Sequence, residues 1–192
     1  MRKKHSGHAL PIIIILVVSL AFGGVFELLC LGGERLSHPR KYQDFVTQYA
    51  AEYGVPEAVI YTMLKVESDF DSTKHGDHDK IGLLQLTPAL YVRLATEAHD
   101  AEMNAAALYD PDTNIRYGTM YLSLLYTKYG MWSTVYAAWY AGEEAVDAWL
   151  ANPDYVDPDF GTLQTVPDKN IAKAVKKAAK AQANYEKLYY AK

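Results

Sequence analysis

The sequence is poor in cysteine and has no excess of charge of either sign. Among 192 residues there is one cysteine, Cys30, so no disulfide can form within the chain and packing alone must stabilise the fold. The 19 Lys and Arg residues nearly balance the 23 Asp and Glu residues. Nucleic-acid binding usually depends on a strongly basic surface, so no nucleic-acid partner is expected. Internal repeats, low-complexity segments and strand-like alternation are absent as well.

Charge is entirely missing from one stretch near the N-terminus. Residues 9–26 form an apolar run of eighteen residues, and Arg2, Lys3 and Lys4 precede it. Eighteen helical residues rise about 27 Å, close to the thickness of the hydrocarbon core of a bilayer. Positive charge on the N-terminal side predicts that this end stays in the cytoplasm. We expect residues 1–30 to form a cytoplasmic tip and one transmembrane helix.

A cleaved signal peptide is the alternative interpretation of this segment. Ser19, Leu20 and Ala21 place small residues where a signal peptidase cuts. The apolar run continues past Ala21, which favours retention as an anchor. Cys30 lacks the preceding small residue that a lipoprotein signal needs. The predicted location is the cell membrane, with the rest of the chain on the extracytoplasmic face; secretion after cleavage is the alternative.

The remainder of the sequence predicts one all-α domain. Residues 31–41 are polar and contain Gly, Ser and Pro, which is typical of a linker. From 42 to 192, apolar side chains recur every three or four residues, as in amphipathic helices. An Asp/Pro-rich surface loop is expected over 153–167. Helices are predicted at 42–53, 56–67, 87–98, 112–129, 132–141, 143–150 and from 168 onward.

Two short motifs lie in register around the end of the second predicted helix. Glu-Ser-Asp-Phe occupies residues 67–70, and Gly-Leu-Leu-Gln follows fifteen residues later at 82–85, before Pro88. This pattern resembles the catalytic core of the lytic transglycosylases of the soluble (Slt) type, in the lysozyme-like superfamily. In that family Glu-Ser-x-Phe is followed at this distance by Gly-Leu-Met-Gln and a Pro. The resemblance implies a lysozyme-like helical domain with an active-site groove.

The resemblance continues downstream, with three departures. Residues 110–122 carry Asp-Pro, Asn-Ile, Gly and Tyr-Leu, similar to the family's third block. Gly76 stands where the family has a Ser that helps to hold the substrate's N-acetyl group. Trp139 and Tyr140 replace a Tyr-Asn pair, and Tyr140 offers a hydroxyl from the neighbouring position. Ile171 stands where the family's last block has Tyr.

The chemistry of glycoside cleavage also points to Glu67. A glycosidic bond breaks when its leaving oxygen is protonated, which requires a carboxylic acid that stays protonated near neutral pH. Burial raises a carboxyl pKa because it disfavours the charged form, and Val66, Phe70, Leu83 and Leu84 are candidates for an apolar wall. The alternative is an ordinary solvated glutamate, as most are. The second motif in register favours the catalytic role.

The resemblance implies a peptidoglycan lytic transglycosylase, a lyase that acts on the β-1,4 bond between MurNAc and GlcNAc. Glu67 is expected to protonate the bridging oxygen and then, as a carboxylate, to accept the proton of the muramic acid C6 hydroxyl. That hydroxyl attacks C1 and forms a 1,6-anhydro ring. The implied partner is the peptidoglycan glycan strand, and no cofactor is implied. The residues expected in the groove wall are Gln85, Leu84, Tyr121, Trp139 and Tyr140.

Two other functions remain open from the sequence. A lysozyme-type hydrolase would need a second carboxylate to activate water, and Asp69, Asp71, Asp77 and Asp79 lie near Glu67 in the sequence. A glycan-binding or scaffold protein that kept the fold and lost turnover is consistent with the three departures from the family pattern.

A metal site is not expected. His75, Asp77, His78 and Asp79 include possible metal ligands, but their spacing matches no closed structural site. The chain also lacks the cysteines that would complete one. A solvated polar loop is the preferred interpretation of this segment.

Overall fold

The computed structural model describes residues 19, 33–100 and 104–191. The chain divides into two compact units, Met1–Pro39 and Arg40–Lys192. Of the first unit, residues 19 and 33–39 are described, and residues 33–37 are helical. The predicted membrane anchor within 1–30 therefore lies, apart from residue 19, outside the described residues. Within the described ranges, no helix has both the length and the apolar character needed to cross a bilayer.

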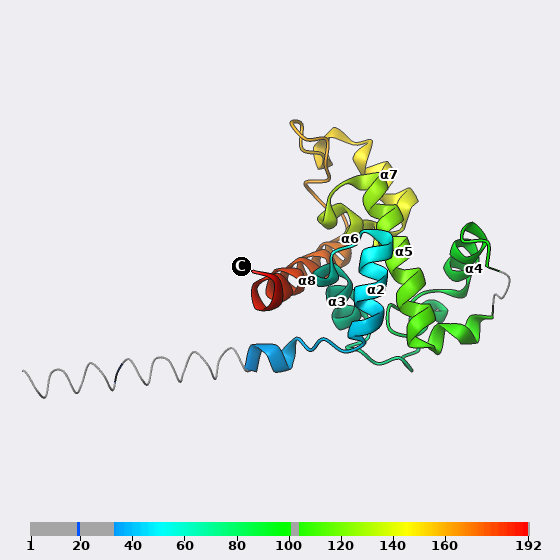
Figure 1. The fold of residues 1–192 in the computed structure, drawn as a ribbon. Coiled ribbons are helices and arrows are strands. Elements are labelled where there is room, and N and C mark those ends of the chain that lie inside the picture. Colours follow the sequence, from blue (N-terminus) through cyan, green and yellow to red (C-terminus); the bar gives the residue numbers. More distant parts are fainter. Residues whose placement is uncertain (1–18, 20–32, 101–103, 192) are drawn as a thin grey trace, which may run out of the picture. The chain divides into compact units, whose positions relative to one another are not determined.

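The second unit is built of helices (Figure 1), which confirms the predicted all-α class. The observed helix ends agree with the predicted ones to within about one residue, apart from the open-ended last helix. In the described part of the chain, β-structure is limited to isolated bridges such as His75 with Ile81 and Val156 with Leu163. The α-helices are α2 Gln43–Tyr53, α3 Glu57–Glu67, α4 Pro88–Glu97, α5 Pro111–Tyr129, α6 Trp132–Ala141, α7 Glu143–Leu150 and α8 Lys169–Tyr185.

Capping residues explain where three of these helices begin. The side chains of Thr87, Asp110 and Asp168 each accept a hydrogen bond from a backbone N–H in the first turn of α4, α5 and α8. These are the orphan donors that a helix N-terminus leaves unpaired. Pro88 and Pro111 occupy the first helical positions of α4 and α5, where a missing N–H is harmless.

In the described residues, three short 3-10 turns were not predicted from the sequence, and a π-helical turn ends the last predicted helix. They are one to two turns long, so they have too few residues to show a 3.6-residue period. Local side chains cap two of them: Asn104 Oδ1 accepts from the Ala106 N–H at 2.9 Å in η2, and Asn152 Oδ1 accepts from the Asp154 N–H at 3.0 Å in η3. The turns are η1 Asp77–Asp79, η2 Ala105–Tyr109, η3 Pro153–Tyr155 and the π-helical η4 Glu186–Tyr190.

Asn114 joins the turn that carries the second motif to α5. Its side chain is fully buried. Its Oδ1 accepts from the Leu84 N–H at 2.7 Å, and its Nδ2 donates to the carbonyl oxygens of Ile81 at 3.0 Å and Leu108 at 2.8 Å. A buried amide with all these partners satisfied fixes the turn in one orientation.

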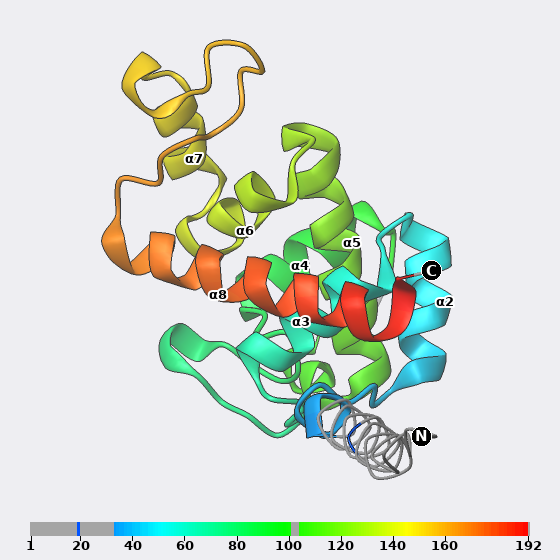
Figure 2. The ribbon, with the colours of Figure 1, turned by 90° about the vertical axis from the view of Figure 1, so that its left-hand side faces the viewer.

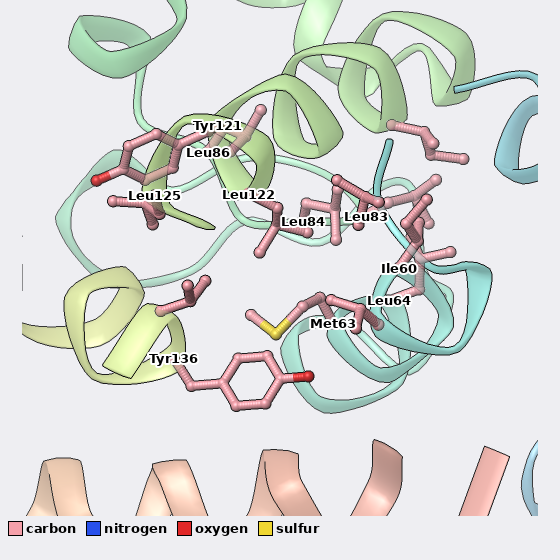
Figure 3. Close-up of a cluster of buried hydrophobic side chains, with 14 of the residues drawn as sticks. Ile60, Met63, Leu64, Leu83, Leu84, Leu86, Tyr121, Leu122, Leu125 and Tyr136 are labelled. Atoms are coloured by element: carbon pink, nitrogen blue, oxygen red, sulfur yellow. The ribbon is translucent and has the colours of Figure 1, made fainter. Parts of the chain in front are cut away.

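Close-packed apolar side chains surround this turn (Figure 3). The buried residues come from α3, from the turn, and from α5 and α6, so the core lies between these elements. The labelled members are Ile60, Met63, Leu64, Leu83, Leu84, Leu86, Tyr121, Leu122, Leu125 and Tyr136.

Helix α8 packs against both α3 and α6 (Figure 2). The rings of Tyr61 in α3 and Tyr185 in α8 stack with their centroids 5.5 Å apart. The Tyr136 hydroxyl of α6 donates to Gln182 Oε1 of α8 at 2.7 Å. Helix α8 therefore holds together α3, which ends at Glu67, and α6, which carries Tyr140.

Close packing against Leu84 explains why a glycine occupies position 118 inside α5. A Cβ placed at Gly118 would lie 2.2 Å from Leu84 Cδ1 and 3.0 Å from Leu84 Cβ. Leu84 is fully buried, so its side chain has no free space into which it could move. The absent side chain lets the motif turn approach α5 closely.

We expect Gly118→Ala to destabilise the protein. Alanine gains about 1 kcal/mol of helix propensity, but overpacking a filled core typically loses about 1–3 kcal/mol. The net loss should lower the melting temperature by several degrees, measured by circular dichroism. Thr127→Ala, an exposed change in the same helix, is the control and should shift stability by less than about 0.5 kcal/mol. A higher melting temperature for Gly118→Ala would contradict the packing argument.

Candidate active site

Glu67 is the last residue of α3, and the residue is only 9% exposed. After Ser68 the chain turns through two consecutive non-glycine residues in the left-handed region, Asp69 (φ 54°) and Phe70 (φ 65°). Such conformations cost of order 1 kcal/mol or more each and persist where surrounding structure enforces them. Phe70 is buried, and its N–H donates to the Leu64 carbonyl oxygen at 3.2 Å. The strained turn therefore fixes Glu67 at the helix end.

Burial raises the pKa of Glu67, and this effect outweighs four opposing ones. The ammonium group of Lys80 is the largest influence in the other direction, followed by a hydrogen bond from the Tyr140 hydroxyl and by the charges of Lys74 and Lys177. Each of these favours the carboxylate. The net result is a carboxyl group that holds its proton more tightly than an exposed glutamate does.

Tyr140 is the donor in its hydrogen bond with Glu67. Burial, and then the nearby Glu67 carboxylate, raise the pKa of the Tyr140 phenol well above its ordinary range. The phenol therefore keeps its proton at any physiological pH and can donate a hydrogen bond to a carboxylate oxygen. The hydroxyl that the sequence offers at this position lies against the predicted catalytic acid.

The loop over 71–80 is tied back to Glu67 and to the second motif. Lys74 Nζ donates to the backbone carbonyl oxygen of Glu67, at the C-terminal end of α3, where positive charge is favourable. Gln85 Nε2 donates to the carbonyl oxygens of Gly82 at 2.7 Å and of Lys74 at 3.2 Å. Gln85 is itself buried and left-handed (φ 49°). Its amide thus positions the loop as well as facing the groove.

Two adjoining clefts form the groove. The first has a volume of about 330 Å³ and is lined by Glu67 and Lys74 among others. The second has about 210 Å³ and includes Trp139 in its lining. Lys80 and Gln85 line both clefts and therefore lie where the two meet. The acid lies in a polar cleft that continues into a more aromatic one.

Of the five side chains expected in the groove wall, three line a cleft. Gln85, Tyr121 and Trp139 line the second cleft, and the rings of Tyr121 and Trp139 are 5.4 Å apart. Tyr140 reaches Glu67 through its hydroxyl. Tyr140 and Leu84 line neither cleft, and the Leu84 side chain is fully buried against Gly118. The prediction that Leu84 forms part of the wall is wrong: the space at Gly118 draws it into the core.

Gly76 leaves room for Gln85. A Cβ at Gly76 would lie 2.1 Å from Gln85 Oε1. Any side chain here, including the serine of the family pattern, would displace the Gln85 amide from its present position. The glycine at position 76 is therefore what allows the Gln85 amide to lie where it does.

Three cations near Glu67 were not anticipated from the sequence. Lys74 and Lys80 stand at the two ends of the charged part of the loop, which is the segment least like the family pattern. That departure from the family was the one sequence signal that pointed to them. Lys177 comes from α8, and its Nζ donates to the Val66 carbonyl oxygen at 3.4 Å. A contact across 111 residues leaves no local pattern in the sequence.

The four aspartates considered for a lysozyme-type hydrolase differ in their position relative to the cleft that holds Glu67. Asp77 lines the first cleft together with Glu67, and it is exposed. Asp69, Asp71 and Asp79 do not line that cleft. Among the residues the structure describes, no three His, Cys, Asp or Glu side chains gather in a way that could hold a metal ion.

Comparison with known proteins gives one consistent family. The model described as "Transglycosylase SLT domain" matches residues 44–158. The membrane-bound lytic murein transglycosylase C of Actinobacillus pleuropneumoniae is 34% identical over 92 residues, which are 47% of this chain and 25% of the relative. The chain thus spans about a quarter of the length of the curated relatives that it matches.

Two solved structures share the fold. The 70 kDa soluble lytic transglycosylase of Escherichia coli matches with a TM-score of 0.74 at 23% identity, over 82% of this chain and 26% of that one. The lytic transglycosylase Slt of Pseudomonas aeruginosa, solved as an inactive glutamate-to-glutamine mutant, matches with a TM-score of 0.71 at 23% identity, over 81% and 25%. The helical arrangement around the groove is therefore one already seen in lytic transglycosylases.

We expect Glu67→Gln to stabilise the protein at neutral pH. A raised pKa in the folded state means that the unfolded chain releases this proton first, so stability falls as pH rises above the ordinary glutamate pKa of about 4.3. Glutamine has no proton to release. Thermal unfolding should show a higher melting temperature for the variant at pH 7 and a smaller difference near pH 4. Asp69→Asn is the control, because the Lys65 hydrogen bond lowers the pKa of Asp69, and it should show no such gain.

We expect Tyr140→Phe to raise the pKa of Glu67 further. The variant removes a donor that favours the carboxylate and keeps the apolar ring that buries it. Titration of the Glu67 side-chain carboxyl by ¹³C NMR measures the change directly. Tyr121→Phe, in the second cleft, is the matched control and should leave the midpoint in place. Equal midpoints in wild type and Tyr140→Phe would rule out the hydrogen bond.

Proposed function

Because the chain belongs to the transglycosylase SLT family, we propose that it is a peptidoglycan lytic transglycosylase that cleaves the β-1,4 bond between MurNAc and GlcNAc. One observation carries the proposal. The Glu67 carboxyl is buried and has a raised pKa, yet it lines an open cleft. A general acid for glycoside cleavage needs both a retained proton and access to the substrate.

In the first step Glu67 donates its proton to the glycosidic oxygen, and the bond from C1 of MurNAc to that oxygen breaks. GlcNAc leaves with the proton as a hydroxyl group. The burial that raises the pKa of Glu67 keeps the proton on the carboxyl group to a higher pH than on an exposed glutamate. The substrate's own acetamido group is expected to stabilise the positive charge that develops at C1.

In the second step Glu67 is a carboxylate and acts as base. It takes the proton of the MurNAc C6 hydroxyl, whose oxygen attacks C1 and closes the 1,6-anhydro ring. The groups that oppose the raised pKa now serve the reaction, since Lys80, Tyr140, Lys74 and Lys177 all stabilise the anion. Glu67 regains its proton, no water is consumed, and no second carboxylate is required.

The second cleft is proposed to hold the neighbouring sugars. Tyr121 and Trp139 present aromatic rings beside the polar amide of Gln85. Flat apolar faces next to a few hydrogen-bonding groups suit sugar rings, which have both kinds of surface. This arrangement supports a glycan strand that runs through both clefts past Glu67.

We also propose that the N-terminal segment anchors the protein in the membrane as a single span, with the domain on the extracytoplasmic face. The support is the uncharged run over 9–26 behind Arg2, Lys3 and Lys4. A curated relative is likewise named as membrane-bound.

Glu67→Gln tests the proposed reaction. Glutamine keeps the shape of the side chain and has no carboxylic proton, so activity should fall by about a hundredfold to ten-thousandfold. Release of sugars from purified wall by the detergent-solubilised full-length protein, followed by mass spectrometry, measures this. The Pseudomonas neighbour described as inactive carries the same kind of substitution. Products of the wild type should end in 1,6-anhydroMurNAc, one water lighter than hydrolysis products.

Asp77→Asn is the matched control, because Asp77 lines the same cleft. It should retain far more activity than Glu67→Gln. Reducing ends in the products, with activity lost in Asp77→Asn, would instead establish a lysozyme-type hydrolase. Wall binding without release by the wild type would establish a scaffold.

A further inference from the structure

The cleft that holds Glu67 carries more positive charge than the role of Glu67 as a proton donor requires. Lys74 and Lys80 line it, and Lys177 approaches the same helix end through the Val66 carbonyl oxygen. Across the described residues, none of these three lysines forms an ion pair with an Asp or Glu side chain. Their ammonium groups are therefore not held in ion-pair contact by a carboxylate of the described residues.

This arrangement works against the first chemical step. Positive charge close to a carboxyl group lowers its pKa and so favours early loss of the proton. Lys80 is the strongest of these influences on Glu67. A negative charge brought by the substrate would compensate the lysines when the bond is to be broken.

Lys80 is placed to meet the substrate at the point of cleavage. It is half-buried and lines both clefts, so it lies where the sugars on either side of the scissile bond would meet. Its backbone is held, because its carbonyl oxygen accepts from the Gly76 N–H at 2.8 Å and its N–H donates to the Asp77 carbonyl oxygen at 3.4 Å. The side chain therefore starts from a fixed position.

We propose that Lys80, supported by Lys74, binds a carboxylate carried by the muramic acid residue at the scissile bond. The inference rests on the proposed function and deepens it by naming a charged feature of the substrate. GlcNAc is neutral, whereas muramic acid bears a lactyl side chain that ends in a carboxyl group. An ammonium group and a carboxylate form a strong, charge-assisted hydrogen bond.

The carboxylate has two possible sources. On a strand stripped of peptides it is the free lactyl carboxylate; on a peptide-bearing strand the lactyl group is an amide, and the first carboxylate belongs to the peptide stem. The chemistry at Lys80 is the same in both. Asp77 also lines the cleft. Its carboxylate would compete with the substrate carboxylate for Lys80.

The experiment compares four forms of one purified wall. Peptide-bearing wall and amidase-stripped wall are each tested with their carboxyl groups free and after conversion to neutral amides with a carbodiimide and ammonia. Initial rates of 1,6-anhydro product are measured for the full-length wild type, Lys80→Gln and Lys80→Arg. Lys180→Gln, an exposed lysine of α8 outside both clefts, is the matched control.

The readout is the ratio of rates on the free and amidated forms of the same wall. Because the ratio is taken within one enzyme, any effect of Lys80 on the acidity of Glu67 cancels at a given pH. For the wild type and Lys180→Gln we expect a ratio of about ten to a hundred on the wall that supplies the carboxylate. Lys80→Gln should bring the ratio close to one, and Lys80→Arg should restore much of it. The wall on which the ratio is large identifies the source.

Two results would overturn the inference while leaving the proposed function intact. One is anhydro product formed by the wild type at equal rates from free and amidated walls. The other is a ratio that is large and the same in wild type and Lys80→Gln, which would place the carboxylate at another group. Absence of anhydro product from all four walls would instead overturn the proposed function, and with it this inference.

Discussion

The state of one carboxyl group depends on a balance between burial and charge. Burial at the end of α3 favours the protonated form of Glu67, while three ammonium groups and the Tyr140 hydroxyl favour the anion. A reaction in which the same group gives and then takes a proton needs both forms within reach. The elements around Glu67 supply the two influences separately: the core provides the burial, and the loop, α6 and α8 provide the polar groups.

A second constraint is the fixed position of the motif turn on α5. Asn114 uses both ends of its amide to hold the backbone at Ile81, Leu84 and Leu108. Gly118 lets the turn approach, and Gln85, at the far side of the turn, holds the loop that carries the lysines. The groove is rigid where it meets the core, so the groups around Glu67 do not need substrate to bring them together.

The sequence predicted the helices well because capping residues and apolar periodicity are local signals. Motifs at family spacing pointed to Glu67, which lies in one cleft, and to Tyr121 and Trp139, which line the adjoining one. Prediction from the sequence placed Leu84 wrongly, because the matching space at Gly118 lies 34 residues further along the chain. The influence of Lys177 on Glu67 was also beyond reach, since nothing near either residue in the sequence records that α8 packs against α3. Local features could be predicted from the sequence, whereas contacts between distant segments could not.

Helix α8 also determines when, during synthesis, the groove can be completed. The ribosome makes α3 with its glutamate and α6 with its tyrosine before it makes α8, the helix that packs against both. Until Tyr185 stacks on Tyr61 and Gln182 accepts from Tyr136, those faces of α3 and α6 lack their cover. A nascent chain therefore holds the acid and its phenolic partner without the support that aligns them. Under the proposed function, assembly that waits for residues 169–185 delays completion of the active site until synthesis has passed that point.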